Sequence, residues 1–452
     1  MVSSSTPYVE TKIRQKETGI KRIADLLAMD PKNDPFYSGQ PADVKAAEWF
    51  MDIWRMLGYD GGVHLRRIHY QVVSLKIDRP YRDGTRRYDN VKSDWQYLQV
   101  AAAHARYMGL LDPEKIEDHR TPSPDLNSQA VYRRAIEWEI SWEEWVVPSI
   151  DISMDLTLPT FESWSYQYGS DRQPWNIEIW VEKSTQNDIL EPICRRRGVN
   201  LVTGIGFMTV TSVVDLIKRV ERGGKPTVIF YISDFDPAGE FMPRQVARQA
   251  EFWGRRHATD QKIVLEPLIL TKDQVMEYDL PPLPVDEKEK TDDRIKFFLD
   301  RYGVEGPTEL DALEALHPGE LARIVNDAID LYQDKDLERK FLVANAEARK
   351  ELQQAWDDVL SPYEDQVQNL EERIREVGRK HIGAFNAEVE HLLEELKYLQ
   401  QAFEADLAYV RIDLPPLPET EVQGLDRPPY FDSSREYMEQ LRYYKNLNGD
   451  GA

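Results

Sequence analysis

Apolar and polar positions in the middle of the chain follow a pattern that predicts a parallel sheet. Apolar runs at 177 to 181 and 228 to 232 have the length of buried strands, and a third run at 199 to 203 lies between them. The segments near 185 to 196 and 209 to 222 have the apolar spacing of helices. Because strands that alternate with helices form crossover units, this region predicts an α/β domain with a Rossmann-like parallel sheet.

Two of these predicted strands end on acidic residues. Glu182 follows the run at 177 to 181, and Asp234 and Asp236 follow the run at 228 to 232. Since reactive groups collect at the carboxyl ends of parallel strands, we expect the three carboxylates to converge. Hard oxygen ligands of this kind suit Mg²⁺. The alternative is that the Asp-x-Asp-Pro sequence only caps a helix that begins near Glu240.

A second amphipathic pattern lies nearer the N-terminus. On a helix, one apolar face is formed by Leu65, Ile68, Val72 and Leu75. Tyr70 falls on the opposite face, one turn after Arg66 and Arg67. Two guanidinium groups would favour the phenolate form of Tyr70 and would also attract phosphate, as a nucleophile for a phosphodiester requires. The alternatives are that Tyr70 stacks on bases, contacts phosphate without reacting, or packs under a neighbouring segment.

The surroundings of Tyr70 are basic, although the whole chain has a net charge of −23. Residues 62 to 110 contain nine Lys or Arg against four acidic residues, which is typical of a phosphate-facing surface. We expect DNA contacts from Arg66, Arg67, Arg82, Arg86, Arg87 and Lys183. A helix near 90 to 108 and an extended tail at 116 to 120 are compatible with a winged helix, or with a three-helix scaffold that does not contact DNA.

The acidic residues are concentrated in a long helical stretch from about Asp336 to Ile412. Its apolar positions alternate in steps of three and four, at Val367, Leu370, Ile374, Val377 and His381 and again at Phe385, Val389, Leu392, Leu396, Leu399 and Phe403. The extra four-residue step between His381 and Phe385 is a stutter in a predicted coiled coil. We expect this arm to mediate self-association or to bind a coiled-coil partner, with His381 as a register device.

Two further segments have distinct compositions. The sequence Asp-Leu-Pro-Pro-Leu-Pro occurs at 279 to 284 and again at 413 to 418, and we interpret both copies as stiff spacers. Acidic side chains in 308 to 313 could approach the metal site, with helix capping by Thr308 as the alternative.

Length and composition limit the class of protein. A chain of 452 residues with 41% apolar residues favours about three domains with ordinary cores. No apolar run has the length of a membrane span, and residues 1 to 16 lack the apolar core of a signal peptide. Cys194 is the single cysteine, which excludes a disulfide framework and a cysteine-based zinc site. We therefore expect a cytoplasmic protein.

Several motifs together resemble a known family. They are Val181-Glu182-Lys183, Val202-Thr203-Gly204-Ile205-Gly206-Phe207, Asp234-Phe235-Asp236-Pro237-Ala238-Gly239 and, earlier in the chain, His64-Leu65-Arg66-Arg67-Ile68-His69-Tyr70. The first three resemble the successive motifs of a Toprim domain, in the version found in the A subunit of topoisomerase VI and the related meiotic double-strand-break transesterase. The fourth resembles the winged-helix segment that supplies the nucleophilic tyrosine of that family. The resemblance covers roughly residues 60 to 330.

The resemblance implies specific roles. Glu182, Asp234 and Asp236 would bind Mg²⁺ at the scissile phosphate, Tyr70 would be the nucleophile, and Arg66 its companion arginine. It also implies a homodimer, in which the tyrosine of one protomer meets the Toprim site of the other, and a separate ATPase subunit for strand passage. The sequence departs from the family pattern at two places. Ser184-Thr185 stands where relatives carry acidic or small residues, and Ile205 replaces a lysine common in the family.

We therefore expect an N-terminal helical segment at 1 to 60, a winged-helix-like domain at 61 to 150 and a Toprim domain at 151 to 275. A linker and helical extension at 276 to 334, the coiled coil at 335 to 412 and a Pro-rich tail at 413 to 452 would follow. The leading hypothesis is a Mg²⁺-dependent enzyme that cleaves DNA by tyrosine transesterification. The alternatives are a Toprim nuclease that forms no covalent intermediate, and a non-catalytic DNA-binding or assembly protein.

Overall fold

The computed structural model describes residues 5–75, 78–82, 84, 86–117, 122–128, 140–141, 159–161, 165–204, 206, 208–257, 259–285, 292–380, 385–410 and 418–447. The chain divides into two compact units. The first unit comprises Met1–Val131, Ser170–Asp334 and Glu421–Ala452. The second unit comprises Tyr132–Gly169 and Lys335–Thr420. Each unit is a separate structural body and is described in turn.

The first unit is built on a five-stranded sheet with the strand order β11-β10-β9-β7-β8. The strands are β7 (Asn176–Val181), β8 (Asn200–Thr203), β9 (Thr227–Ile232), β10 (Ile263–Ile269) and β11 (Phe431–Asp432). The first four of these are parallel, and β11 pairs antiparallel with β10 at one edge. Every residue of β7, β8 and β9 is buried, which explains why these strands are mostly apolar. The buried carboxylate of Glu178 in β7 is paired with Arg219. The predicted mixed α/β fold with a parallel sheet is confirmed.

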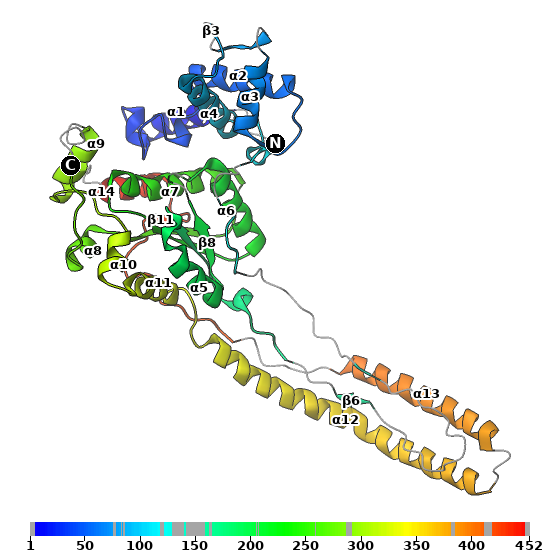
Figure 1. Cartoon of the computed structure of the whole chain (residues 1–452). Helices are drawn as coiled ribbons and strands as arrows, with labels where there is room; N and C mark the ends of the chain where they lie inside the picture. Colours follow the sequence, from blue (N-terminus) through cyan, green and yellow to red (C-terminus); the bar gives the residue numbers. More distant parts are fainter. Residues whose placement is uncertain are drawn as a thin grey trace. The chain divides into compact units, whose positions relative to one another are not determined.

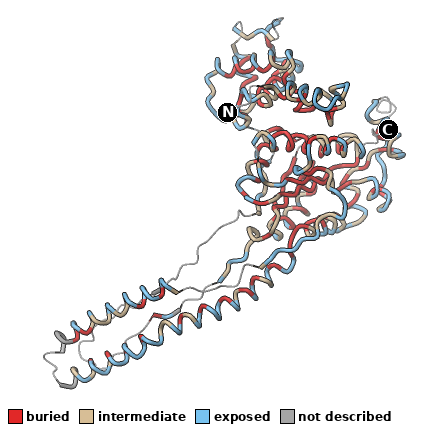
Figure 2. The backbone as a smooth tube through the Cα atoms, turned by 180° about the vertical axis from the view of Figure 1, so that it is seen from behind, coloured by how far each residue is buried: buried red, intermediate tan, exposed pale blue. Residues whose placement is uncertain are grey.

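Helices cover both faces of this sheet (Figure 1). One face packs against α6 (Val210–Gly223), α7 (Pro237–His257) and α14 (Tyr437–Leu447). The other face packs against α5 (Asn187–Arg197) and α11 (Glu320–Asp330), with contributions from α8 (Lys272–Glu277), α9 (Asp293–Tyr302) and α10 (Asp311–Leu316). Figure 2 shows buried backbone concentrated in the strands and in the helices beside them. The sheet is therefore enclosed, and only its strand ends are open to a ligand.

A separate helical core precedes the sheet in the first unit. It consists of α2 (Pro41–Met56), α3 (Leu65–Ser74) and α4 (Lys92–Tyr107), which share one apolar cluster. Strand β1 (Val63–His64) pairs in parallel with β4 (Ile116–Glu117), and β2 (Tyr81–Arg82) forms a hairpin with β3 (Arg86–Arg87) between α3 and α4. On α3, Ile68 and Val72 are fully buried while Tyr70 is exposed, so the predicted amphipathic face is confirmed.

The remaining short elements are α1 (Pro7–Thr18), η1 (Ile23–Leu26), η2 (Pro35–Tyr37), η4 (Pro113–Lys115), η5 (Ser170–Arg172) and η6 (Ser184–Gln186). Within the described residues, no helix is long and apolar enough to cross a membrane. The domain limits expected from the sequence remain a prediction.

The second unit contains two long helices rather than one continuous stretch. Helix α12 (Leu337–Lys380) and helix α13 (Phe385–Tyr409) pack antiparallel, as the ion pair between Arg373 and Glu395 and the 5.3 Å ring contact between Trp356 and Phe403 show. The apolar seam of α12 is buried against α13, with Val367, Leu370, Ile374, Val389 and Leu392 in one cluster. The expectation of a single unbroken helix is wrong, because spacing alone does not distinguish a partner helix in the same chain from one in another chain.

The predicted stutter falls where α12 ends, and His381 lies outside the described residues. The second unit also contains the short strands β5 (Ile140–Ser141) and β6 (Thr160–Phe161), which pair antiparallel. Asn345 of α12 donates a hydrogen bond from Nδ2 to the carbonyl of Tyr166 at 3.0 Å.

Candidate functional site

The sheet brings two of the predicted metal ligands together. Strands β7 and β9 are parallel neighbours, and Val181 pairs with Ile232 at their carboxyl ends. Glu182 therefore leaves the sheet beside the start of the Asp-x-Asp segment, and the backbone N–H of Asp234 donates to its Oε2 at 3.4 Å. Both side chains are nearly buried, with Glu182 at 8% and Asp234 at 6% exposure. The predicted convergence of Glu182 and Asp234 is a consequence of strand register.

The electrostatics of this group favour a bound cation. Burial, followed by the charges of Asp234 and Asp236, raises the pKa of the Glu182 carboxyl to about 7. Burial also raises the pKa of Asp236, and the charge of Asp234 adds to the shift. Carboxylates that are hard to ionise together become easier to ionise when a divalent cation is present. The oxygen-only donor set of Glu182, Asp234 and Asp236 therefore fits a hard ion such as Mg²⁺.

Lys183 supplies positive charge to the same group. Its Nζ lies 2.5 Å from Asp234 Oδ2 and 2.6 Å from Glu309 Oε2. Although partial burial opposes the charged amine, the hydrogen bonds to Asp234 and Glu309 raise the pKa of Lys183. Lys183 was expected to contact DNA, and in the structure it forms ion pairs with two carboxylates. A metal that binds Asp234 has to compete with this ammonium group.

Glu309 reaches the site because its segment pairs with the Asp-x-Asp loop. Phe235 and Thr308 exchange two backbone hydrogen bonds of 2.9 Å, and the N–H of Leu310 donates to Asp234 Oδ1 at 2.9 Å. The approach of a carboxylate from 308 to 313 is thus confirmed. The alternative of helix capping by Thr308 is wrong, because α10 begins after Leu310 without a side-chain cap and the buried Thr308 Oγ1 has no hydrogen-bond partner in the structure.

Asp236 has a structural task as well as its place beside the site. Its Oδ1 accepts the N–H of Gly239 at 2.5 Å and so caps α7, which begins at Pro237 rather than near Glu240. The turn requires glycine at 239, since a Cβ there would lie 2.0 Å from the carbonyl oxygen of Asp234. Helix capping by Asp236 is therefore confirmed, at the start of α7.

Within the described part of the chain, no three His, Cys, Asp or Glu side chains form a ready group for a metal ion. The contacts give the reason. Asp234 is turned toward Lys183 and the N–H of Leu310, while Asp236 is turned toward the start of α7. A metal would have to draw these side chains in, which requires rotation about their side-chain torsions and no change of the sheet.

Tyr70 lies on a second surface, on α3. Its side chain is 55% exposed, at a cavity of about 250 Å³ that is also lined by Arg66, His69, Asn90 and Trp95. The guanidinium of Arg66 lies 5.7 Å from the centroid of the Trp95 ring, a cation–π distance. The alternative that Tyr70 packs beneath a neighbouring segment is excluded by its exposure.

His69 fixes the position of the Tyr70 ring, and the sequence analysis did not identify it. Its Nε2 lies 3.1 Å from Asn90 Oδ1 and its Nδ1 lies 2.6 Å from the hydroxyl of Tyr88. Because an amide oxygen only accepts, Nε2 carries the proton and Nδ1 accepts from Tyr88. The buried imidazole stacks edge-on against Tyr70 at 5.0 Å. Position 69 has the spacing of the buried face of α3, four residues after Leu65 and three before Val72, and it is buried. A polar imidazole was not counted as part of an apolar face, which is why the sequence pattern did not identify it.

The predicted DNA-binding arginines fall into two groups. Arg82 and Arg86 both bind the buried carboxylate of Asp94, with 2.7 Å from Arg82 Nη1 to Asp94 Oδ1. Burial alone would raise the pKa of Asp94, but the hydrogen bonds from these arginines lower it. They therefore brace the β2–β3 hairpin against α4. Arg66, Arg67 and Arg87 are exposed on the same helical core and are available to phosphate.

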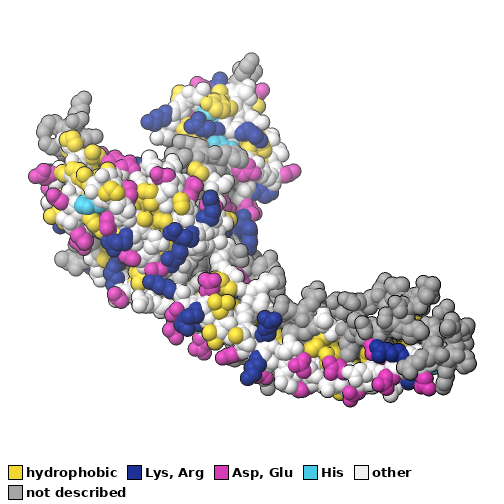
Figure 3. Space-filling model, turned by 60° about the horizontal axis from the view of Figure 1, so that its bottom comes forward, with side chains coloured by type: hydrophobic (Ala, Val, Ile, Leu, Met, Phe, Trp, Pro, Cys, Tyr) yellow, Lys and Arg dark blue, Asp and Glu magenta, His cyan; other side chains and the backbone are white. Residues whose placement is uncertain are grey.

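On the face drawn in Figure 3, basic and acidic side chains are mixed rather than gathered into one field of each sign. Three residues of the basic region and the glycine motif lie outside the described residues, namely Lys76, Ile205 and Phe207.

The cavity beside Tyr70 and the larger cavity beside Asp236 are lined by separate sets of residues, with no member in common. Among known proteins, no family model matches the chain, and no curated protein matches it either.

Proposed function

We propose that this chain is a Mg²⁺-dependent DNA-cleaving enzyme of the topoisomerase VI A-subunit type. The observation that carries the proposal is the convergence of Glu182 and Asp234 at the ends of two adjacent parallel strands, with Asp236 two residues away. The raised pKa of Glu182, about 7, supports it further, since a surplus of buried negative charge favours a dication. The parallel sheet with this rim supports interpretation as a Toprim domain.

The helical core supports the DNA-binding half of the proposal. Helices α2, α3 and α4 enclose one apolar cluster, as the three helices of a winged helix do, and the β2–β3 hairpin lies between α3 and α4. Exposed Arg66 and Arg67 flank Tyr70 on α3. Guanidinium groups bind phosphate with fixed geometry, so this surface suits the backbone of a duplex.

In the proposed reaction, Tyr70 Oη attacks the phosphorus of one phosphodiester. A phosphotyrosyl ester to the 5′ side forms, and the bond to the 3′ oxygen breaks. The phenol loses its proton and the leaving 3′ oxygen gains one, so the exchange is neutral in protons. Arg66 holds the phosphate beside the ring of Tyr70, and His69 holds the ring through their 5.0 Å edge contact. When bound by Glu182, Asp234 and Asp236, Mg²⁺ would supply charge stabilisation for the reacting phosphate oxygens.

The proposed arrangement of the two surfaces follows the family resemblance. In the resembled family the tyrosine of one protomer meets the Toprim site of the other, and the cavities beside Tyr70 and Asp236 of this chain are lined by separate residues. A homodimer with two composite sites would cut each strand of a duplex. Strand passage would need energy from a separate ATPase subunit.

The same separation supports a second candidate, a Toprim nuclease in which water replaces Tyr70. The two candidates differ in their products, because hydrolysis leaves free ends and transesterification leaves protein on the 5′ end. End-labelled DNA should be incubated with wild-type, Tyr70→Phe and Asp236→Ala proteins in Mg²⁺ and run on a denaturing gel. We expect an adduct that is absent with both variants. Cleavage that persists in Tyr70→Phe but is lost in Asp236→Ala would establish the nuclease instead.

A further inference from the structure

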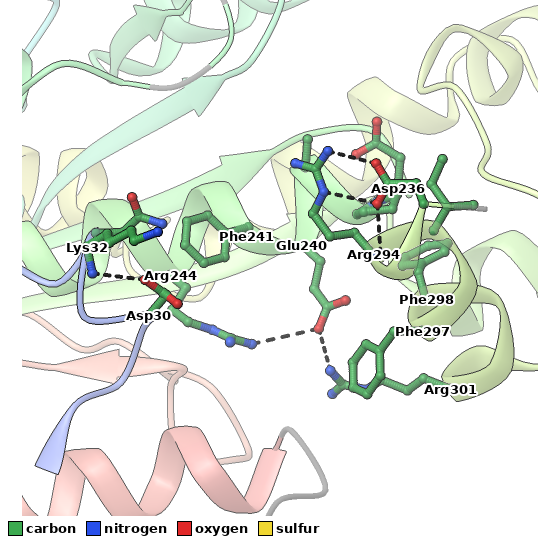
Figure 4. Close-up of a pocket in the computed structure, with 15 residues that line it drawn as sticks. Asp30, Lys32, Asp236, Glu240, Phe241, Arg244, Arg294, Phe297, Phe298 and Arg301 are labelled. Atoms are coloured by element: carbon green, nitrogen blue, oxygen red, sulfur yellow. Dashed lines mark hydrogen bonds and ion pairs between the residues drawn. The ribbon is translucent and has the colours of Figure 1, made fainter. Parts of the chain in front are cut away.

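A large cavity lies beside the carboxylate group, and the proposed cleavage chemistry does not use it. It measures about 820 Å³, within the usual range of small-molecule sites, and Asp236 and Pro237 form part of its wall. Figure 4 shows its other walls, where Glu240, Phe241 and Arg244 project from α7 and Arg294, Phe297 and Arg301 project from α9. The N-terminal segment contributes Asp30 and Lys32.

The cavity combines an exposed aromatic side chain with charged groups of both signs, since Lys32, Arg244, Arg294 and Arg301 line it together with Asp30, Asp236, Glu240 and Asp292. Phe297 leaves 58% of its side chain exposed, which is unusual for a large apolar group on a helix that buries Phe298 completely. The side chain of Arg294 is 84% exposed and forms an ion pair with Asp292, two residues away in sequence. The exposed Lys32 lies on the opposite wall. An aromatic ring for stacking next to cationic groups for phosphate is the chemistry of single-stranded nucleic-acid sites.

The deeper groups distinguish this cavity from a general anion site. Arg301 binds Glu240 at 2.6 Å, and Arg244 Nη2 lies 3.7 Å from the same carboxylate. Glu240 therefore contacts two cations, and it is one of the residues that line the cavity. A carboxylate in this cavity disfavours the binding of a second phosphate group. It can accept hydrogen bonds from the amino or imino groups of a nucleobase. The cavity thus has an acceptor at its floor, an aromatic side chain on one wall and an arginine at its rim.

We propose that this cavity holds an unpaired nucleotide of the DNA strand that is cut. The base stacks on Phe297, its polar edge faces Glu240, and the flanking phosphate contacts Arg294. Because Asp236 belongs both to this cavity and to the carboxylate group, the nucleotide lies next to the scissile phosphate. The inference rests on the proposed function, and it adds that the enzyme favours a substrate with an unpaired base beside the cut.

Binding without cleavage tests this site independently of the chemistry. Fluorescence anisotropy in EDTA should follow a labelled oligo(dT) of about 12 nucleotides, within the usual size of a single-strand site. Since stacking on an aromatic side chain contributes about 1 to 3 kcal/mol per base, Phe297→Ala should weaken binding from about fivefold to about 100-fold. Arg294→Gln should lower the salt slope of binding by about 0.7, the value for one phosphate contact on a single strand.

Matched controls come from the second unit. Tyr398→Ala removes an aromatic side chain that is 72% exposed on α13, and Arg339→Gln removes an exposed arginine that pairs with an acid three residues away, Asp336. Neither control should change oligo(dT) binding by more than about twofold. Equal weakening by Phe297→Ala and Tyr398→Ala would overturn the proposal. So would displacement of oligo(dT) by thymidine monophosphate at equal concentration, because the occupant would then be a free nucleotide.

The preference for an unpaired base provides a further test. Wild-type protein should bind a duplex with one unpaired thymidine more tightly than the fully paired duplex, and Phe297→Ala should abolish that difference. Loss of the difference in Phe297→Ala, with no cleavage by any protein in Mg²⁺, would leave the cavity assignment standing and refute the proposed function. Cleavage by wild-type protein with no effect of Phe297→Ala on binding would support the proposed function and refute the cavity assignment.

Discussion

Replacing Glu182 with glutamine should stabilise the protein above neutral pH in the absence of metal. Glutamine keeps the size of the side chain and an oxygen that can accept the N–H of Asp234, which lies 3.4 Å from Glu182 Oε2. It removes the charge that burial and the neighbouring aspartates disfavour. The substitution therefore separates the structural cost of this carboxylate from its proposed use in metal binding.

The expected magnitude follows from the pKa of Glu182. Burial and the charges of Asp234 and Asp236 raise it from 4.5 to about 7. An acid with a raised pKa in the folded state stabilises that state fully below about pH 4.5, and this contribution is lost as the pH rises through about 7. At about 1.36 kcal/mol for each pKa unit, the loss is about 3 kcal/mol, of which about 2 kcal/mol falls between about pH 5 and pH 8. Glu182→Gln does not undergo this loss.

The assay is urea unfolding in EDTA at several pH values. The free energy of unfolding of Glu182→Gln minus that of wild type should rise by about 2 kcal/mol from about pH 5 to about pH 8. An exposed glutamate on α8 supplies the control, since Glu277→Gln should show no such rise. Mg²⁺ should then raise the melting temperature of wild type at about pH 8, less so near pH 6 where protons compete, and should not raise that of Glu182→Gln.

A flat difference across this pH range would refute the argument from buried charge. Equal stabilisation of wild type and Glu182→Gln by Mg²⁺ would show that the metal binds elsewhere.

Three further predictions concern other parts of the first unit. Gly239→Ala should abolish Mg²⁺-dependent stabilisation, measured by thermal shift, because its Cβ would lie 2.0 Å from the carbonyl oxygen of Asp234. Arg248→Met should lower the free energy of unfolding by about 3 to 5 kcal/mol, measured in urea, because it leaves the buried Asp34 without its ion-pair partner. Arg67→Gln should lower the salt slope of duplex binding by about 0.9 without changing the melting temperature, and an unchanged slope would exclude a phosphate contact.

The sheet and its acidic rim were predictable because their determinants are local. The strands that are buried on both faces are mostly apolar runs, and the acids come within four residues of the strand ends, Glu182 directly after β7 and Asp234 and Asp236 shortly after β9. The register between these strands then places Glu182 beside Asp234 without further information. The amphipathic face of α3 was predictable for the same reason.

Contacts between distant segments were not predictable in this way. Strand β11 pairs with β10, and helix α14 packs on one face of the sheet. The apolar pattern of residues 418 to 447 does not indicate where these elements pack. The contact of Lys183 with Glu309 depends on the pairing of Phe235 with Thr308, which joins segments more than 70 residues apart. The apolar heptad positions of α12 pack against those of α13 in the same chain. The same spacing would be found if the partner helix belonged to another chain, so the sequence could not distinguish the two cases.

The most direct test of the central claim is mass spectrometry of the protein after reaction with DNA. Wild-type protein should be incubated with Mg²⁺ and duplex DNA, denatured, and digested with nuclease and protease. We predict that the peptide with Tyr70 carries a 5′-linked nucleotide, and that this modification disappears in Asp236→Ala although its Tyr70 is intact. Cleaved DNA with free 5′ phosphates and an unmodified Tyr70 peptide would contradict the claim.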